Sequence, residues 1–241
     1  QNPNRHWDRF SSPSEATMRN PCDMGDAGLL IDVPSPFASF PFAWEQAAKS
    51  RGYLCVAGVD EAGRGPLAGP VVAAAIVFPD YWHPEGIADS KALTALQRDR
   101  LFQQICEACA YGVGVVSAGE IDDINILKAT HKAMRLALES LPVRADYALV
   151  DGLPVLGLPI PHQNLVKGER RSVSVAAASI IAKVTRDRMM VALHQSYPAY
   201  GFNRHKGYPT PSHIRALEEH GPCPEHRRSF EPVRRVCGGS R

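Results

Sequence analysis

Apolar positions show no regular period over the first part of the chain, and the pattern then changes. Residues 1–46 are rich in Pro, Ser, Asn and Asp, a composition that predicts a poorly ordered extension. From Tyr53 onward, apolar runs bounded by turn residues predict buried strands. We expect strands at 53–59 (YLCVAGV), 70–78 (PVVAAAIVF), 111–119 (YGVGVVSAG) and 146–152 (DYALVDG), and a short one at 164–169 (NLVKGE).

Other stretches have the spacing of amphipathic helices. The apolar positions of DSKALTALQRDRLFQQICEACA fit one helix, with Ser90 as its expected N-cap. A second helix is expected from about Asn125, because apolar positions from Ile124 to Leu141 recur every three or four residues. His131 lies within this stripe, so it is either a packed histidine of the core or rim, or a catalytic one.

Two more helices complete the pattern. A long helix rich in Ala, Ile and Val is expected at 172–196, and Thr210 caps a last helix that begins with Pro211. The order of strands and helices indicates a layered α/β or α+β fold with a mixed sheet, and we take α/β as the prediction. We expect one domain over 47–241 with a C-terminal helical part from about residue 197.

The chain has 241 residues, of which 44% are hydrophobic, enough for a sizeable core. Its formal net charge of +2 hides an uneven distribution, because residues 160–190 and 203–241 each carry a net charge of +4. This basic last third indicates either an anionic partner bound by one face or simply a solvated surface.

The cysteine and hydropathy patterns limit the classes of protein to which the chain can belong. Six cysteines in a chain of this length do not form a disulfide scaffold. His220, Cys223 and His226 have a spacing compatible with zinc, but no second ligand pair follows. No apolar run is long enough to span a bilayer and no signal peptide is visible, so we expect a soluble, cytoplasmic protein.

Two predicted strands end in a carboxylate next to glycine, in VDEAG and VDG. Binding sites collect at strand ends, so Asp60 and Asp151 are expected to converge. Closely packed carboxylates repel, and a divalent cation such as Mg²⁺ or Mn²⁺ removes that penalty. Glu61 follows Asp60 directly, and neighbours in a regular strand point to opposite faces. Either the strand twists so that both acids face one metal, or one of them is a surface carboxylate.

Beyond these acids, two stretches have the composition of nucleic-acid contacts. In Gly63-Arg64-Gly65 the glycines allow backbone N–H groups to approach a sugar or phosphate, and the arginine can form a bidentate contact with a phosphate. The stretch YGFNRHKGYPT interleaves aromatic and basic residues, which suits stacking on nucleotides and binding of phosphates. The alternative for this stretch is a packed loop with exposed cations.

Several ordered blocks together resemble bacterial type 2 ribonuclease H, the ribonuclease HII family. They are VAGVDEAGRGPLAGPVVAAAIV, DSKALT, IDDINILKAT, VDG, VKGE, AAASIIAKVTRD, YGFNRHKGYPT and HRRSF, which together cover about residues 53–235. The resemblance implies a ribonuclease H-like fold with a central mixed sheet flanked by helices. It also implies an endonuclease that uses Mn²⁺ or Mg²⁺ and leaves 3′-hydroxyl and 5′-phosphate ends. The implied substrates are RNA–DNA hybrids and duplex DNA containing a single ribonucleotide, which is incised on its 5′ side.

The resemblance also assigns roles to residues. Asp60, Glu61 and Asp151 match the metal-binding carboxylates of the family. The fourth carboxylate, normally an aspartate after KG, is Glu169 here, so its reach is longer by one methylene. Asp187 is the rival for this place, but we expect Asp187 to form an ion pair with Lys183 or an arginine instead.

The substrate-binding residues implied by the resemblance surround these acids. Gly63, Arg64 and Gly65 match the loop that reads the ribose 2′-hydroxyl and the adjoining phosphate. Tyr208 matches the tyrosine that packs on the next deoxyribose, and Lys91 matches a lysine that contacts phosphate. Two metal ions held by the acids would act on the scissile phosphate.

Three other functions compete with this reading. A non-catalytic hybrid-binding module has no need for clustered acids, and a junction resolvase of the ribonuclease H-like class does not explain the GRG and KGYPT blocks. A phosphotransferase with a glycine-rich nucleotide loop is disfavoured, because the sequence has no G-x-x-x-x-G-K-[ST] run. We expect the active protein to be a monomer.

Overall fold

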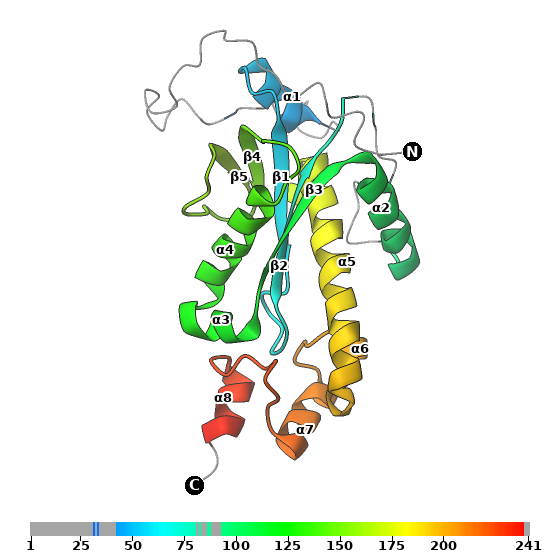
Figure 1. Cartoon of the computed structure of the whole chain (residues 1–241), viewed down its shortest axis with the longest axis vertical. Helices are drawn as coiled ribbons and strands as arrows, with labels where there is room; N and C mark the ends of the chain where they lie inside the picture. The colour runs from blue at the N-terminus through cyan, green and yellow to red at the C-terminus, as the bar shows by residue number, and fades with distance from the viewer. Residues whose placement is uncertain are drawn as a thin grey trace.

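The fold is built on one mixed sheet, seen in a computed structural model that describes residues 31, 33, 42–80, 82, 86–87 and 93–238. The described strands are β1 (Val56–Ala62), β2 (Val71–Val77), β3 (Ala110–Val116), β4 (Tyr147–Asp151) and β5 (His162–Leu165). Their order across the sheet is β3-β2-β1-β4-β5 (Figure 1). The pairs β1–β2 and β2–β3 are antiparallel, whereas β1–β4 and β4–β5 are parallel. The mixed sheet predicted from the sequence is therefore confirmed.

Helices cover both faces of this sheet, and Figure 1 shows the two main ones, α4 (Ile126–Glu139) and α5 (Val173–Ser196), on opposite sides of it. The face toward α4 buries small and β-branched residues of β1, β2 and β4 against Ala129, Ala133 and Met134. The face toward α5 buries β2 against Ala177 and Ile180, and α2 (Ala95–Ala108) packs beside α5. The sheet core is thus apolar on both faces, as expected for strands that read as continuous apolar runs.

Several predicted boundaries change. β1 begins and ends three residues later than expected, at Val56 and Ala62, and β3 ends at Val116 rather than at residue 119. Helix α2 begins at Ala95 and is capped by Thr94, whose hydroxyl accepts a hydrogen bond from the Gln97 backbone N–H, while the Gln97 side chain accepts one from Thr94. The prediction of Ser90 as N-cap was wrong, because this reciprocal capping box satisfies two backbone donors where Ser90 has no matching partner at the third helical position. The fifth strand is also shifted, since β5 ends at Leu165 and the turn to Gly168 follows.

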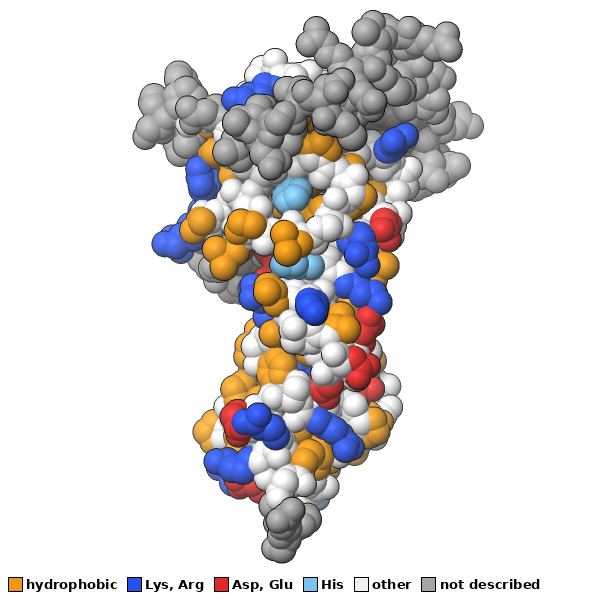
Figure 2. All heavy atoms as spheres, turned by 90° about the vertical axis from the view of Figure 1, so that its left-hand side faces the viewer, with side chains coloured by type: hydrophobic (Ala, Val, Ile, Leu, Met, Phe, Trp, Pro, Cys, Tyr) orange, Lys and Arg blue, Asp and Glu red, His pale blue; other side chains and the backbone are white. Residues whose placement is uncertain are grey.

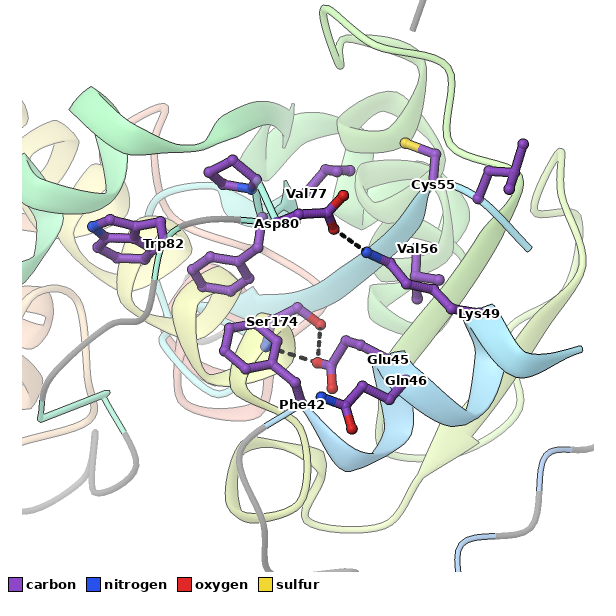
Figure 3. A pocket seen from close by; sticks show the side chains of 13 residues that line it. Phe42, Glu45, Gln46, Lys49, Cys55, Val56, Val77, Asp80, Trp82 and Ser174 are labelled. Carbon is purple, nitrogen blue, oxygen red and sulfur yellow. Dashed lines mark hydrogen bonds and ion pairs between the residues drawn. The ribbon is translucent and has the colours of Figure 1, made fainter. Parts of the chain in front are cut away.

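Helix α1 (Ala43–Ser50) lies across the expected boundary at residue 46 and joins the core. Its Glu45 is buried, and one carboxylate oxygen accepts hydrogen bonds from the Ser172 hydroxyl and from the Ser174 hydroxyl and backbone N–H (Figure 3). These donors lie at the N-terminus of α5, where a carboxylate is favoured by the helix dipole. Helix α1 therefore holds the start of α5. The rest of the expected extension lies outside the described residues, apart from Ile31 and Val33, which are buried, and Phe42, the N-cap of α1.

The C-terminal helical part packs beyond the end of the sheet where β1 and β4 finish (Figure 1). It is joined to α5 and contains α7, capped by the Thr210 hydroxyl with Pro211 in the first turn, as predicted. No helix within the described ranges is both long and apolar enough to cross a membrane. The remaining short elements are α3 (Ala118–Ile124), η7 (Gly168–Arg170), η8 (Pro198–Tyr200), α6 (Phe202–His205), α7 (Pro211–His220) and α8 (Glu231–Gly238).

Three histidine rings pack together in this C-terminal part. The rings of His205 and His213 stack with centroids 4.4 Å apart, and His213 Nε2 lies 3.1 Å from His226 Nε2. His226 also contacts the Cys223 thiol through Nδ1. Burial lowers the pKa of all three imidazoles, and that of His226 falls to about 4, with the charge of His213 as the next cause. The cluster is therefore neutral at neutral pH.

We expect the histidine cluster to make folding sensitive to mild acid. Below the ordinary imidazole pKa of 6.5 the unfolded chain binds protons that the folded chain excludes, so stability falls as pH drops toward about 4. His226 alone would contribute a loss of about 3 kcal/mol over this range. Urea unfolding at several pH values measures this loss. The variant His226→Asn should be less stable at neutral pH but should lose less stability on acidification, and an unchanged pH slope would contradict the assignment.

Candidate active site

The predicted acids lie at the ends of two neighbouring parallel strands. In the β1–β4 register Val59 faces Val150, so Asp60 and Asp151 are the next residues on each strand. Asp60 is buried, and its carboxylate accepts hydrogen bonds from the Glu61 backbone N–H at 2.7 Å and from the Ser179 side chain on α5. In each strand the acid follows the apolar residues, at the point where a polar side chain can leave the core, and β1 itself continues to Ala62.

Burial and, after it, electrostatic repulsion disfavour ionised acids at this end of the sheet. The pKa of Asp60 is raised well above its usual value, first by burial and then by the charges of Glu61 and Asp151. Burial also raises the pKa of Glu61; Arg64 opposes this shift and Asp151 adds to it. The three carboxylates are thus close enough for each charge to disfavour the others.

Glu61 leaves the strand on the opposite face from Asp60, because β1 stays regular through Ala62. One carboxylate oxygen of Glu61 lies 3.2 Å from the Arg64 guanidinium. The other oxygen, Oε2, is buried without a hydrogen-bond partner among the described residues. The sequence argument left open whether Glu61 belongs to the site or to the surface, and its burial and its proximity to Asp151 favour the site.

Glu169 approaches the same strand end through the turn after β5. It lies in η7 and is buried, and the preceding Gly168 donates its backbone N–H to Asp151 at 2.6 Å. A Cβ at residue 168 would lie 3.1 Å from the same Asp151 oxygen, so glycine permits this close approach. The backbone therefore joins the segment of Glu169 directly to the Asp151 carboxylate.

The donor atoms of these four residues are oxygens, which suit a hard divalent cation. Within the described ranges no three His, Cys, Asp or Glu side chains form a ready-made metal cluster. Yet the orphaned Oε2 of Glu61 and the raised pKa of Asp60 both show negative charge that lacks compensation. A divalent cation would supply that compensation, so the residues fit such an ion.

The GRG loop follows directly after the two acids of β1. Gly63 is buried with φ of 97°, a left-handed conformation that favours glycine, whereas Arg64 and Gly65 are exposed. A Cβ at Gly65 would meet only the Tyr208 ring, at 3.8 Å. The predicted reader loop and the predicted tyrosine therefore lie side by side, beside the acids.

A groove of about 310 Å³ runs from Glu61 along α5. Its walls carry cationic groups from two helices, Arg98 of α2 and Lys183 of α5, together with the aromatic ring of Tyr208. Lys183 also pairs with Asp187 at 2.7 Å, which confirms the ion pair expected for Asp187. This combination of charge and aromatic surface suits a phosphodiester backbone.

Other predicted residues are placed as follows. Lys91 lies outside the described residues. His131 is half-buried at the rim, accepts a hydrogen bond from the Leu156 N–H at 3.4 Å, and has a pKa lowered by burial and by Arg64. His226 and Cys223 touch in the buried cluster, whereas His220 is exposed.

Sequence reasoning missed several residues near the site, although the blocks that carry the family resemblance contain most of them. Ser179 and Arg186 stand in AAASIIAKVTRD, and Arg227 stands in HRRSF. Arg98 lies outside every block and carries no such signal. The basic last third was expected to form a surface, yet Arg186 and Arg227 are 1% and 0% exposed.

Figure 2 shows Lys and Arg side chains along the face that carries α3 and α4, interspersed with hydrophobic and acidic ones.

A second cavity, of about 110 Å³, lies at the other end of β1, between α1 and the start of the strand (Figure 3). It is lined by Phe42, Phe78 and Trp82, and Lys49 pairs with Asp80 beside it. No carboxylate of the candidate active site lines this cavity. Catalysis is therefore assigned to the groove beside Glu61 rather than to this more enclosed pocket.

Comparisons with known proteins agree with this site. The family model for Ribonuclease HII matches residues 57–233. The ribonuclease HII of Syntrophotalea carbinolica is 50% identical over 207 residues, covering 86% of this chain and 99% of that protein. The solved ribonuclease H2 of Pyrococcus horikoshii superimposes with a TM-score of 0.67 at 33% identity, covering 76% of this chain and 97% of that one.

A further solved structure is the ribonuclease HII of Archaeoglobus fulgidus in complex with PCNA, with a TM-score of 0.63 at 26% identity. The match covers 74% of this chain and 96% of that one. These likenesses confirm the predicted ribonuclease H-like fold and disfavour the junction resolvase and the non-catalytic module. The chain belongs to the ribonuclease HII family.

Proposed function

We propose that this protein is a metal-dependent endoribonuclease that cleaves the RNA strand of RNA–DNA hybrids and incises duplex DNA on the 5′ side of a single embedded ribonucleotide. Membership of the ribonuclease HII family supports the class of reaction. The observation that carries the proposal is the group of mutually repelling carboxylates at the ends of β1 and β4, directly beside the GRG loop. A protein that only bound nucleic acid would be weakened by such acids, because they repel phosphate.

The carboxylates of Asp60, Glu61, Asp151 and Glu169 would hold two divalent cations, Mn²⁺ or Mg²⁺. When bound, such ions lower the pKa of an attacking water and stabilise the leaving 3′-oxygen, which gives 3′-hydroxyl and 5′-phosphate ends. The protein supplies the orientation of the ligands. Ser179 and the Glu61 N–H fix the Asp60 carboxylate, and the Gly168 N–H fixes that of Asp151.

Selection of RNA requires contact with the 2′-hydroxyl, which is the group that distinguishes RNA from DNA. We assign this contact to the exposed backbone of Gly63, Arg64 and Gly65, and we place the neighbouring Tyr208 ring against the next deoxyribose. Lys91 is assigned a contact with phosphate. Because its substrate is a nucleic acid and its site is built from one chain, we further propose that the protein acts as a monomer in the cytoplasm.

The proposed activity predicts a specific cleavage pattern. With Mn²⁺ or Mg²⁺, the purified protein should nick a labelled DNA duplex that contains one ribonucleotide, at the 5′ side of that nucleotide. Gel analysis of both labelled ends identifies the position of the cut and the terminal groups. The same duplex made entirely of DNA is the control, and absence of nicking on the ribonucleotide duplex would refute the proposal.

A further inference from the structure

Two arginines are buried beneath the GRG loop, and neither forms a salt bridge in the described part of the chain. The acidic charges that act on them from nearby are Asp187 for Arg186 and Asp122 for Arg227. Arg186 and Arg227 are 1% and 0% exposed and belong to the largest fully buried side chains. Their hydrogen bonds to described residues all go to backbone carbonyl groups. Burying a charge is costly unless it is compensated. Two buried charges side by side therefore indicate a role that neutral side chains could not fill.

Arg227 determines which way the peptide groups of the GRG loop point. Its guanidinium donates to the carbonyl oxygens of Gly63 at 2.6 Å, of Arg64 at 2.9 Å, and of Gly69 at 2.9 and 3.0 Å. In a trans peptide the C=O and the following N–H point in opposite directions, and no cis bond occurs in the described residues. With these two carbonyls turned inward, the N–H groups of Arg64 and Gly65 must point outward.

The outward amides have no other use in the described part of the fold. Arg64 and Gly65 are exposed, and neither backbone N–H donates a hydrogen bond to another described residue. Two adjacent free donors on a loop held from behind form a small concave site for an oxygen atom. The carbonyl group of each of these two peptides therefore has a structural role, while the N–H group can bind a ligand.

Arg186 ties the same loop to the segment that carries Tyr208. It donates to the carbonyl oxygens of Pro70 at 2.9 Å, Ala68 at 3.1 Å and Lys206 at 3.0 Å. The Leu67 N–H also donates to the Gly207 carbonyl at 2.8 Å. These bonds connect the loop after β1 to the KGY segment, so the loop amides and the Tyr208 ring cannot move independently.

Glycine at position 63 makes room for this arrangement. A Cβ on Gly63 would lie 2.0 Å from Arg186 Nε and 2.8 Å from the Pro70 carbonyl oxygen. Gly69 and Gly207 have the same function, because a Cβ there would lie 2.2 Å from Met190 Sδ and 2.6 Å from the Ala68 carbonyl oxygen. Gly63 is thus needed for packing against Arg186, and Gly69 and Gly207 for packing against Met190 and the Ala68 backbone, whereas Gly65 faces open space beside Tyr208.

We propose that Arg227 and Arg186 are positioning residues that preform the ribose-reading site, by holding the carbonyl groups of residues 63–70 inward so that the Arg64 and Gly65 amides face the 2′-hydroxyl and its adjoining phosphate. This inference rests on the proposed function. It extends that function, since it names the buried groups that fix the loop rather than the loop itself.

The positive charges of the two guanidinium groups also favour binding of the substrate at this loop. Burial and the neighbouring Arg186 lower the pKa of Arg227 to about 9, so Arg227 still carries its proton at neutral pH. A positive potential beneath a loop with outward N–H groups favours an anion on the exposed side. A phosphate bound next to the ribose would add to the countercharge that Asp122 and Asp187 supply without forming a salt bridge.

The test measures discrimination between two duplexes in the absence of metal, so that no cleavage interferes. Fluorescence anisotropy gives the Kd of the full-length protein for a duplex with one ribonucleotide and for the all-DNA duplex of the same sequence. We expect the wild type to prefer the ribonucleotide duplex by about tenfold, the value of one good hydrogen bond. Arg227→Lys keeps the charge but loses the planar fork, so the preference should fall toward one while the affinity for all-DNA stays within about twofold.

A matched control is Arg228→Lys, the same change at the neighbouring, exposed arginine, which should leave the preference intact. If folded Arg227→Lys keeps the full preference, the inference is wrong. If the wild type itself has no preference, ribose reading by this loop fails, which is a different result. Loss of affinity for both duplexes by the same factor would show a general structural role and would also overturn the inference.

Because Arg227→Lys could fail to fold, amide hydrogen exchange in the wild-type protein provides an independent measurement. The Arg64 and Gly65 amides should exchange rapidly in the free protein. They should become protected on binding the ribonucleotide duplex but not on binding the all-DNA duplex. Protection of both amides in the free protein would show that they point inward, which would overturn the inference without any substitution.

Discussion

Replacing Asp60 by asparagine is expected to abolish cleavage and at the same time to stabilise the metal-free protein. Loss of a metal-binding carboxylate removes several kcal/mol of transition-state stabilisation, so the rate should fall on the order of 10³-fold or more. The stability gain has a separate cause. The unfolded chain ionises Asp60 freely, whereas burial and the charges of Glu61 and Asp151 resist that ionisation in the folded state. Asparagine removes this cost, and we expect a gain of about 1–2 kcal/mol at neutral pH.

The pH dependence of this gain in stability shows whether it comes from removing an unfavourable charge or from better packing. The folded-state pKa of Asp60 is raised, so its cost exists only above the usual aspartate pKa and disappears as pH falls to that value. Thermal unfolding of Asp60→Asn and wild type should therefore differ at neutral pH and converge in acid. Cleavage is measured under single-turnover conditions with Mn²⁺. A variant that still cleaved within about tenfold of the wild type would remove Asp60 from the metal site.

Substitutions of two other acids serve as comparisons for the Asp60→Asn experiment. Asp187→Asn is the matched control, because Asp187 is a half-buried acid of α5 that pairs with Lys183, and the variant should keep most of the activity. Glu169→Asp restores the residue that the family usually has after KG. If Glu169 is a metal ligand, this change should alter the rate or the metal optimum, and an unchanged profile would show that the position is peripheral.

The hydrophobic pattern was sufficient for the sheet but not for every boundary. β1 and β2 could be predicted because their residues are apolar on both faces and glycine or proline flanks them. The start of α2 could not, because Ser90 and Thr94 are equally good N-caps by residue type and only the Gln97 side chain decides between them. Likewise α1 has only eight residues, and its place in the fold depends on Glu45 capping the distant α5.

The candidate active site, like the fold, could be predicted from the sequence only in part. Asp60 and Asp151 could be predicted to converge because both end apolar strands, and the parallel register of β1 and β4 then places them together. Arg186 and Arg227 could not be predicted, because a basic residue in a sequence is normally a surface residue. Only the folded chain reveals that carbonyl groups of residues 63–70 surround both guanidiniums.

A large loss of stability from a single methyl group is expected at Gly58, in the middle of β1. There α5 crosses the strand so closely that a Cβ on Gly58 would lie 2.1 Å from the Ser174 carbonyl carbon and 2.4 Å from the Val175 nitrogen. Both are backbone atoms of a helix, so they cannot turn aside as a side chain would. Gly58→Ala should therefore push α5 away from the sheet and lower the free energy of unfolding by about 3 kcal/mol. Because α5 also carries Ser179, which holds Asp60, cleavage should fall as well.

Gly119 offers the matched control for this prediction. It lies in helix α3, and a Cβ there would have no neighbouring atom within 4 Å. Gly119→Ala should raise stability by about 0.5–1 kcal/mol, since alanine has less freedom to lose than glycine in a helix. Urea unfolding of both variants, with nicking rates measured well below the melting temperature, separates folding from catalysis. If Gly58→Ala were as stable as wild type, the close contact between β1 and α5 would be wrong, and with it the support that this contact gives to the Asp60 carboxylate.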